Sequence, residues 1–289
     1  IQDVYESSPT ELRALALKKH SLGSVAEGGR VTLTLPAREP FDGAGVVAFL
    51  QARAIDGVES VVDGTYTRSL RLPHGQAVIS LRPRASDVVC TALIENLADL
   101  STLVSRVRRL FDLDADSQAI DEALSAEVEL RPLVQAVPGI RIPGSTDAHE
   151  TVFRALIGQQ VSVKAARTVL GRLTKTLGDR VTISEDSVTS LFPTAEQILC
   201  GAREILQGPS RRIETVLRVA ELLASGELTI DVGTSHADLV RSLTAVPGIG
   251  PWTAGYVALR VLGAPDILLD GDLAMRKGAD RCGLPGSPR

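Results

Sequence analysis

The 289-residue sequence predicts a mostly α-helical protein whose N-terminal part is a smaller α+β domain, an antiparallel sheet with two helices. Two observations lead to this fold class. From Val31 to Leu35 apolar and polar residues alternate, which is typical of a strand with one buried face. After Asp112 the apolar residues instead recur at helical spacing, and cap residues and glycines separate the runs. We therefore divide the chain into residues 1–28, 29–112 and 113–289.

The first segment is expected to be the end of another domain followed by a linker. Ser8 and Pro9 precede Thr10 in a pattern that is typical of a helix start. One short helix cannot bury a core of its own. Residues 21–30 are rich in glycine and serine, so a flexible connection is expected before the sheet begins.

The second segment carries strand and helix patterns bounded by turn residues such as Pro36. We expect strands at Val31–Leu35, Thr65–Leu72, Ala77–Leu81 and Asp87–Ile94, and helices at Gly45–Ala54 and Asn96–Phe111. The second helix should place its apolar residues on one face, namely Leu97, Leu100, Val104, Val107 and Phe111. No cluster of charges in this segment suggests catalysis.

The third segment is expected to be entirely helical. Asp147, with Glu150 three residues later, resembles a capping box, and the helix that follows runs into Gly158. Ser162 is a cap candidate for the next helix, which should stop at Gly178. The expected helices cover residues 116–124, 132–137, 147–157, 163–177, 194–206, 210–225, 235–245 and 251–262.

Charge is distributed unevenly along the chain. The net charge of −4 and the pI of about 5.7 argue against a protein that coats nucleic acid through bulk charge. Two stretches, residues 151–178 and 239–262, nevertheless contain basic residues and no Asp or Glu. The first carries Arg154, Lys164, Arg167, Arg172 and Lys175, and the second carries Arg241 and Arg260. These are either solvated helix faces or a short footprint for DNA.

Cysteine and histidine give no indication of a metal site. Three cysteines lie far apart, and the four histidines show no ligand spacing. No apolar run reaches the ~18 residues of a membrane span, and the N-terminus shows no signal pattern. We expect a soluble protein of the cytoplasm, without a membrane partner.

The Val246–Pro251 stretch is a turn between two helix patterns. Gly248 and Gly250 allow the backbone to approach a ligand closely, and Pro251 suits the first turn of a helix. Free N–H groups at such a helix start bind phosphate oxygens. The pattern predicts a helix-hairpin-helix that binds the DNA backbone through Gly248, Ile249, Gly250 and Thr253. An ordinary tight turn is the alternative.

Trp252 and Tyr256 lie four residues apart and therefore share one helix face. Aromatic residues at this spacing are usually part of a core. Only 3% of the chain is aromatic, however, and this pair directly follows the hairpin. We expect the pair to form a base pocket, because a base flipped out of the duplex needs aromatic surface in place of its lost stacking.

Asp270 and Asp272 follow an apolar run and precede another helix pattern. The ordinary interpretation of Asp272 is a helix cap. The functional interpretation is a carboxylate beside a sugar C1′, where it stabilises the oxocarbenium-like state formed when a glycosidic bond breaks. A cationic alkylated base is a good leaving group, so a single carboxylate could suffice.

Residues 243–276 resemble the signature of the HhH-GPD superfamily of DNA glycosylases, and most closely its 3-methyladenine DNA glycosylase II (AlkA) family. Residues 153–162 resemble the turn from which that family inserts a wedge into DNA, which implies Gln160 as the wedge beside Gln159. Residues 66–70 and 211–223 also resemble the family, so the likeness covers about residues 31–280. It implies an N-terminal α+β domain followed by the helical HhH-GPD glycosylase fold.

The resemblance also implies an activity. Bifunctional relatives carry a lysine nucleophile where this chain has Trp252, so a monofunctional glycosylase acting on alkylated bases in double-stranded DNA is expected. The order Gly271-Asp272-Leu273 favours Asp272 as the catalytic residue, whereas the pattern of adenine-mismatch glycosylases would select Asp270. No cofactor is expected, apart from a monovalent cation that could join the hairpin to a phosphate. A monomer associated with a bacterial nucleoid fits this role. The alternative is a non-catalytic module that binds damaged DNA.

Both ends of the chain suggest a longer protein. Residues 1–28 resemble the remnant of an AraC-type helix-turn-helix domain of the kind found in Ada-type response proteins. The family also continues with more helix beyond the catalytic Asp. We therefore expect the glycosylase half of an Ada–AlkA fusion, shortened at its C-terminus.

Overall fold

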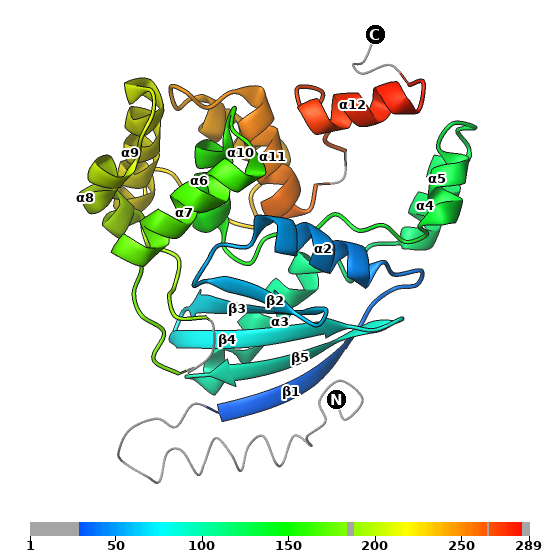
Figure 1. The fold of residues 1–289 in the computed structure, drawn as a ribbon, viewed down its shortest axis with the longest axis horizontal. Helices are drawn as coiled ribbons and strands as arrows, with labels where there is room; N and C mark the ends of the chain where they lie inside the picture. Colours follow the sequence, from blue (N-terminus) through cyan, green and yellow to red (C-terminus); the bar gives the residue numbers. More distant parts are fainter. Residues whose placement is uncertain (1–28, 184–187, 265, 285–289) are drawn as a thin grey trace.

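The computed structural model describes residues 29–183, 188–264 and 266–284, so the helix and linker expected in residues 1–28 lie outside it. A five-stranded antiparallel sheet forms the N-terminal part, with the strand order β1-β5-β4-β3-β2 (Figure 1). The strands are β1 (Gly29–Pro36), β2 (Glu59–Val62), β3 (Thr65–Leu72), β4 (Gly75–Pro83) and β5 (Asp87–Ile94).

Two helices accompany this sheet, as expected. Helix α2 (Gly43–Arg53) lies between the sheet and the helical region, and α3 (Leu100–Leu110) follows a short 3-10 turn, η1 (Leu97–Asp99) (Figure 1). Alternate strand residues such as Leu33, Leu81 and Cys90 are fully buried and form the first core with the apolar residues of these helices. Burial raises the pKa of the Cys90 thiol to about 12, so this thiol is a core group rather than a reactive one.

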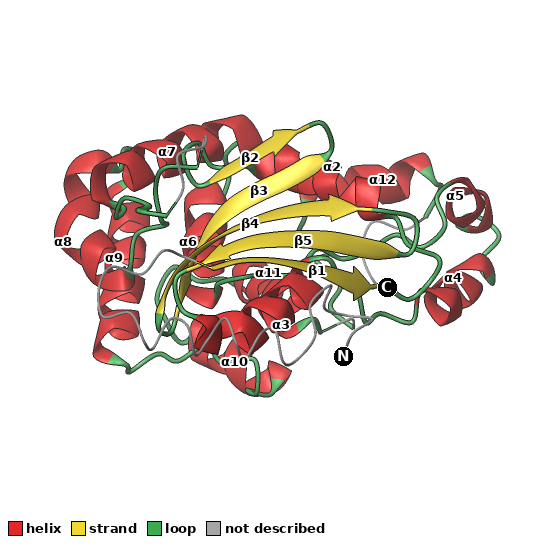
Figure 2. Ribbon diagram, turned by 90° about the horizontal axis from the view of Figure 1, so that it is seen from below, coloured by secondary structure: helices red, strands yellow, loops and turns green. Residues whose placement is uncertain are grey.

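The remaining helices form a second layer. Figure 2 shows α6 to α9 at one end of the sheet and the α4–α5 pair at the other. Their bounds are α4 (Ser117–Ser125), α5 (Arg131–Ala136), α6 (Ala148–Gly158), α7 (Val163–Leu177), α8 (Ala195–Ile205), α9 (Ser210–Ser225), α10 (His236–Thr244), α11 (Pro251–Leu262) and α12 (Leu273–Arg281). Ile55 and Val58 from the N-terminal part join the core of this layer. No helix in the described part of the chain is both long and apolar enough to cross a membrane.

The expected strands and helices are confirmed, with three differences. Strand β2 was not predicted, because four residues are too few to show an alternating pattern. The helix expected from Asn96 is divided between η1 and α3. All five residues of the expected apolar face contact the core, Val107 and Phe111 fully buried and Leu97, Leu100 and Val104 partly buried. Leu103 and Leu110 are buried as well, so the buried face is broader than expected.

The capping box expected at the start of α6 is only half formed. The Asp147 side chain accepts a hydrogen bond from the Glu150 N–H at 2.9 Å. The Glu150 carboxylate does not return this bond but accepts one from Arg68 on β3 at 2.7 Å and one from Arg154 at 2.7 Å. Glu150 therefore joins the helical layer to the sheet, which a local sequence pattern cannot reveal.

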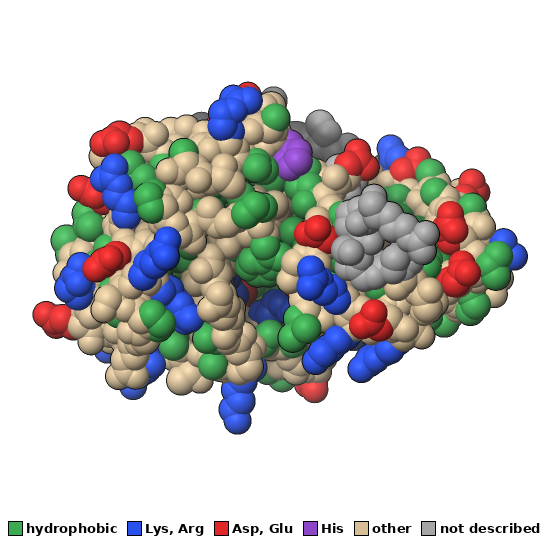
Figure 3. Space-filling model, turned by 90° about the horizontal axis from the view of Figure 1, so that it is seen from above, with side chains coloured by type: hydrophobic (Ala, Val, Ile, Leu, Met, Phe, Trp, Pro, Cys, Tyr) green, Lys and Arg blue, Asp and Glu red, His purple; other side chains and the backbone are tan. Residues whose placement is uncertain are grey.

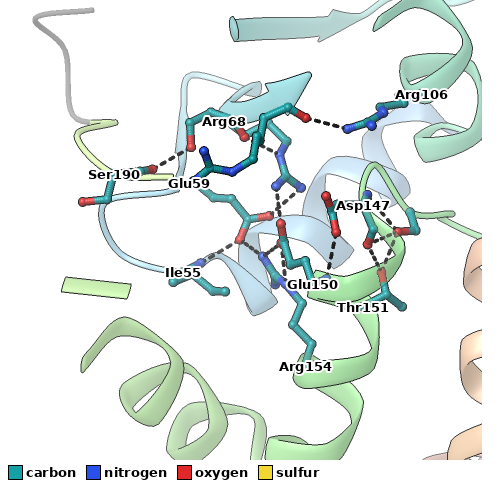
Figure 4. Close-up of polar contacts among 12 residues, drawn as sticks. Ile55, Glu59, Arg68, Arg106, Asp147, Glu150, Thr151, Arg154 and Ser190 are labelled. Carbon is teal, nitrogen blue, oxygen red and sulfur yellow. Dashed lines mark hydrogen bonds and ion pairs between the residues drawn. The ribbon is translucent and has the colours of Figure 1, made fainter. Parts of the chain in front are cut away.

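These contacts belong to a buried charge cluster, which we define as Glu59, Arg68, Glu150 and Arg154 (Figure 4). Glu59 and Arg68 are directly opposite each other on β2 and β3. The Tyr66 hydroxyl donates to Glu59 at 2.5 Å, and burial together with Glu59 raises the pKa of this phenol. Half of this cluster lies in residues 29–112, where the sequence suggested no cluster for catalysis, and its buried ion pairs join the sheet to α6.

Candidate active site

A cleft with a volume of about 1050 Å³ separates α2 from the helical layer. It is lined by residues of α2, α6, α7, the α10–α11 hairpin, α11 and the start of α12. Figure 3, which views the helical side, shows the molecule hollowed near its middle, with basic and apolar side chains around and inside the hollow. The cleft contains Trp252, Tyr256 and Asp272, so the three residues expected to act on a base and its sugar are brought together.

The hairpin between α10 and α11 has the geometry that its glycines suggested. Gly248 adopts a φ of 95°, in the left-handed region. Its Cα also faces the Thr215 side chain on α9, and the Thr215 hydroxyl lies 3.2 Å from the Pro247 carbonyl oxygen. Helix α9 therefore fixes the position of the turn.

The N–H groups of the hairpin differ in their availability. Ile249 donates to the Val246 carbonyl at 3.1 Å, so its N–H is already used. Within the described residues the N–H groups of Gly248 and Gly250 have no protein acceptor. The Thr253 side chain is buried and its hydroxyl accepts from Gln159 at 2.6 Å, which leaves only the N–H of Thr253 for a phosphate. The hairpin thus presents backbone donors and no side-chain cation.

Replacing Gly248 with Ala should disrupt this turn. A Cβ at Gly248 would lie 2.1 Å from the Thr215 Oγ1, at a φ that costs a non-glycine residue roughly 1–3 kcal/mol by itself. Urea denaturation should show at least this loss in the free energy of unfolding. Gly250→Ala is the matched control, because its φ is −92° and its Cβ would meet no atom within 4 Å. Equal stability of the two variants would contradict the assigned turn geometry.

Trp252 and Tyr256 form one stacked pair, which confirms that they share a helix face. Their ring centroids are 5.3 Å apart and the planes differ by 20°. The rings are in contact, so a base would stack on the open side of the pair rather than between its members. Both side chains are half-buried, and the Trp252 Nε1 is enclosed without a hydrogen-bond partner in the described structure.

The opposite wall of the cleft comes from α2 and was not foreseen. The Arg53 guanidinium lies 3.7 Å from the centroid of the Phe49 ring, and the Arg260 guanidinium lies 4.5 Å from the same centroid. Burial lowers the pKa of Arg53, with Tyr256 and Asp272 acting in the opposite direction and Arg260 adding to the decrease. Arg53 therefore lies within electrostatic range of Asp272 and of the stacked pair. A helix pattern alone cannot show which of its residues will face a distant cleft.

The two candidate carboxylates occupy different environments. Asp272 lines the cleft and is half-buried, whereas Asp270 is exposed and is not part of the cleft lining. The ordinary interpretation of Asp272 also holds, because its Oδ1 accepts from the N–H groups of Ala274 at 2.8 Å and Met275 at 3.1 Å. Its Oδ2 has no hydrogen-bond partner among the described residues. One oxygen thus caps α12 and the other remains for a ligand.

The two glutamines after α6 have separate roles in the structure. Gln160 is exposed at the cleft and adopts a φ of 56°, which is unusual for a residue other than glycine. Gln159 instead donates to Thr253 and so connects the end of α6 with the start of α11. Of this pair, Gln160 is the side chain that projects free of the protein at the position expected for a wedge.

The basic stretches contribute less to an exposed surface than their composition suggested. Arg154 belongs to the buried charge cluster, and Arg260 donates to the Pro143 carbonyl at 2.6 Å while it packs on Phe49. Arg241 is exposed, but its charge is paired with Asp238 on the same helix. The exposed basic residues on α7 are Lys164, Arg167, Arg172 and Lys175. Any DNA footprint beside the cleft therefore depends on the hairpin N–H groups and the start of α7, whereas Arg172 and Lys175 lie outside the cleft lining.

A helix-hairpin-helix beside a cleft with stacked aromatics, followed by an Asp at the next helix start, defines the class of HhH-GPD glycosylase folds. Solved structures agree with this fold. A 3-methyladenine DNA-glycosylase from Archaeoglobus fulgidus matches with a TM-score of 0.74 at 20% identity, covering 89% of this chain and 88% of that one. An 8-oxoguanine glycosylase/lyase from Clostridium acetobutylicum matches with a TM-score of 0.66 at 17% identity, covering 86% and 83%.

Sequence comparison identifies the particular family. The AlkA N-terminal domain model matches residues 32–147, which extends beyond the boundary expected at residue 112. The DNA-3-methyladenine glycosylase 2 of Escherichia coli is 31% identical over 252 residues, covering 84% of this chain and 86% of that protein. This chain belongs to the 3-methyladenine DNA glycosylase II (AlkA) family.

A longer relative shows that the chain corresponds to part of a larger protein in at least one organism. A probable bifunctional transcriptional activator/DNA repair enzyme AlkA from Mycobacterium tuberculosis is 41% identical over 284 residues. The match covers 98% of this chain but only 57% of that protein. The chain thus spans little more than half the length of this relative.

Proposed function

We propose that this chain is a monofunctional DNA glycosylase that releases alkylated bases, of the 3-methyladenine type, from double-stranded DNA. The observation that carries the proposal is that one cleft is lined by Asp272, by the stacked Trp252–Tyr256 pair and by the hairpin glycines. Membership of the AlkA family supports it. Release of the base would begin base-excision repair.

Each part of the cleft has a distinct task in this proposal. The free N–H groups of the hairpin hold a phosphate near the lesion, and Gln160 occupies the space that the flipped base leaves in the duplex. The base stacks on the open side of the aromatic pair. Asp272 stabilises the positive charge that develops at C1′ as the bond from C1′ to the base nitrogen breaks. Water then adds to C1′, and the product is a free base and an abasic site.

The absence of a nucleophilic amine at the start of α11 supports hydrolysis without strand cleavage. Trp252 occupies the position two residues after the last hairpin glycine. An indole cannot form the Schiff base through which a lysine would open the sugar and cleave the strand. The proposed reaction needs no cofactor, and a monovalent cation between hairpin and phosphate stays a prediction.

The context of the reaction also stays a proposal. The name of the Mycobacterium tuberculosis relative supports a whole protein that combines the glycosylase with a transcription-regulating part. A monomer that works on the bacterial nucleoid in the cytoplasm fits a cleft formed within one chain. The alternative, a module that binds damaged DNA without releasing a base, is disfavoured by the free Oδ2 of Asp272 in the cleft.

The test uses a methylated DNA duplex and distinguishes a glycosylase, which releases a base, from a module that only binds damaged DNA. Free bases are measured by mass spectrometry, and strand breaks are measured with and without alkali. We expect free 3-methyladenine, and breaks only after alkali treatment. Tight binding without any free base would support the binding module instead. Strand breaks without alkali would contradict the monofunctional assignment.

A further inference from the structure

The C-terminal end of α2 is held from across the cleft by two arginines. The last carbonyl groups of a helix have no partner within the helix, and they carry the negative end of its dipole. Here the Arg53 carbonyl accepts from Arg154 at 3.1 Å, and the Ala54 carbonyl accepts from the Arg167 Nε at 2.7 Å. The carbonyls of the last α2 residue and of the C-cap residue that follows it are thus both held by side chains of the helical layer.

The two arginines lie on either side of the loop that carries Gln160. Arg154 lies on the last turns of α6, just before the Gln159–Ser162 loop, and Arg167 lies on the first turns of α7, just after it. The loop carries the exposed Gln160. Both helices that flank the wedge loop therefore hold the same end of α2.

That end of α2 also forms the far wall of the cleft. Phe49 and Arg53 occupy its last two turns, and both line the cleft with Asp272. Arg154 is itself fixed by Glu59 and Glu150 of the charge cluster, as Figure 4 shows. Glu59 additionally accepts from the Ile55 N–H at 2.8 Å, directly after α2. The end of α2 therefore has little freedom to move independently of the wedge loop.

We infer that Arg154 and Arg167 are positioning residues that couple the wedge loop to the cleft wall formed by Phe49 and Arg53. Insertion of Gln160 into DNA and closure of the wall around a base are then parts of one motion. Neither arginine acts on the base or sugar. This inference rests on the proposed glycosylase function, and it assigns to Arg167 a role other than binding phosphate.

The test compares Arg167→Met with Arg172→Met. Arg172 is exposed on the same helix, as Arg167 is, but it lies outside the cleft lining and has no hydrogen bond to the end of α2 in the described structure. The Met side chain keeps the apolar stem of Arg. Base release in a single turnover should fall about tenfold in Arg167→Met, because small displacements of positioned groups cost this much or more. The affinity for a duplex containing an abasic site should stay within about twofold of wild type. Arg172→Met should keep the wild-type rate of release.

A second measurement does not depend on activity. Trp252 is the only tryptophan of the chain and lies in the cleft, so its quenching by acrylamide reports access to the cleft in DNA-free protein. We expect stronger quenching in Arg167→Met and in Arg154→Lys, because Lys is a point charge and cannot bridge the partners of Arg154. Quenching should be unchanged in Arg172→Met.

Several outcomes would overturn the inference. One is an Arg167→Met variant that matches Arg172→Met in both release rate and quenching. Another is weakened binding to abasic DNA with an unchanged rate of release, because Arg167 would then be a phosphate contact. If wild-type protein releases no base, the proposed function fails, whereas the quenching comparison still decides whether the two arginines hold the wall.

Discussion

Replacing Asp272 with Asn is expected to slow base release by about 100- to 1000-fold, the range typical of losing a group that stabilises transition-state charge. Asn is the most informative substitution, because it removes the negative charge of the carboxylate and keeps the N-cap of α12. Its side-chain oxygen can still accept from the N–H groups of Ala274 and Met275, and Asn is as good an N-cap as Asp. A folded but inactive variant should therefore result. Single-turnover release from methylated DNA measures the effect.

Asp270→Asn is the matched control for this prediction. Asp270 is exposed and outside the cleft lining, and its carbonyl, rather than its side chain, accepts from Arg276 at 2.5 Å. We expect a rate of base release within about twofold of wild type, as for an exposed residue without a role in the transition state. A large loss in Asp270→Asn combined with normal activity in Asp272→Asn would reverse the assignment of the two carboxylates.

The second large effect concerns the buried charge cluster. Arg68→Met is expected to lower the free energy of unfolding by about 3–5 kcal/mol, because removal of one partner leaves buried carboxylates incompletely paired. The Arg68 side chain is only 5% exposed and pairs with Glu150 at 2.7 Å. Arg71→Met on the same strand is the control. Arg71 pairs with Asp179 at the surface, where an ion pair contributes at most about 1 kcal/mol. Urea denaturation measures both, and similar losses would contradict the burial argument.

The same cluster predicts how stability depends on pH. Burial alone would raise the pKa of Glu150, but Arg68 and Arg154 outweigh it and hold this pKa below its ordinary value of 4.5. A carboxyl group with a lowered pKa in the folded state stabilises the protein above its unfolded pKa, and this contribution disappears as the pH falls through the folded pKa. Wild type should therefore lose stability below about pH 4.5 more steeply than Glu150→Gln. Parallel pH profiles would contradict this.

Local patterns were sufficient to predict the parts of the site that depend on neighbouring residues. The turn at Gly248, the shared face of Trp252 and Tyr256, and the cap at Asp272 each depend on residues within one or two turns. The spacing of such residues is visible in a single sequence.

Other features depend on long-range pairing and were beyond sequence reasoning. Arg68 and Glu150 are 82 residues apart, and Gln159 and Thr253 are 94 apart. Which partners meet is decided by how the sheet packs on α6 and α11. For the same reason the Phe49–Arg53 wall was missed, and Arg154 was interpreted as a surface cation although its side chain is only 20% exposed.

The central claim is that Asp272 stabilises positive charge on the sugar, and a transition-state mimic tests it most directly. Binding is compared between a duplex with a cationic pyrrolidine in place of the sugar and one with an uncharged tetrahydrofuran. Wild type should bind the cationic duplex at least about tenfold more tightly, whereas Asp272→Asn should bind both equally. Equal affinities in wild type, or a preference that persists in Asp272→Asn, would contradict the claim.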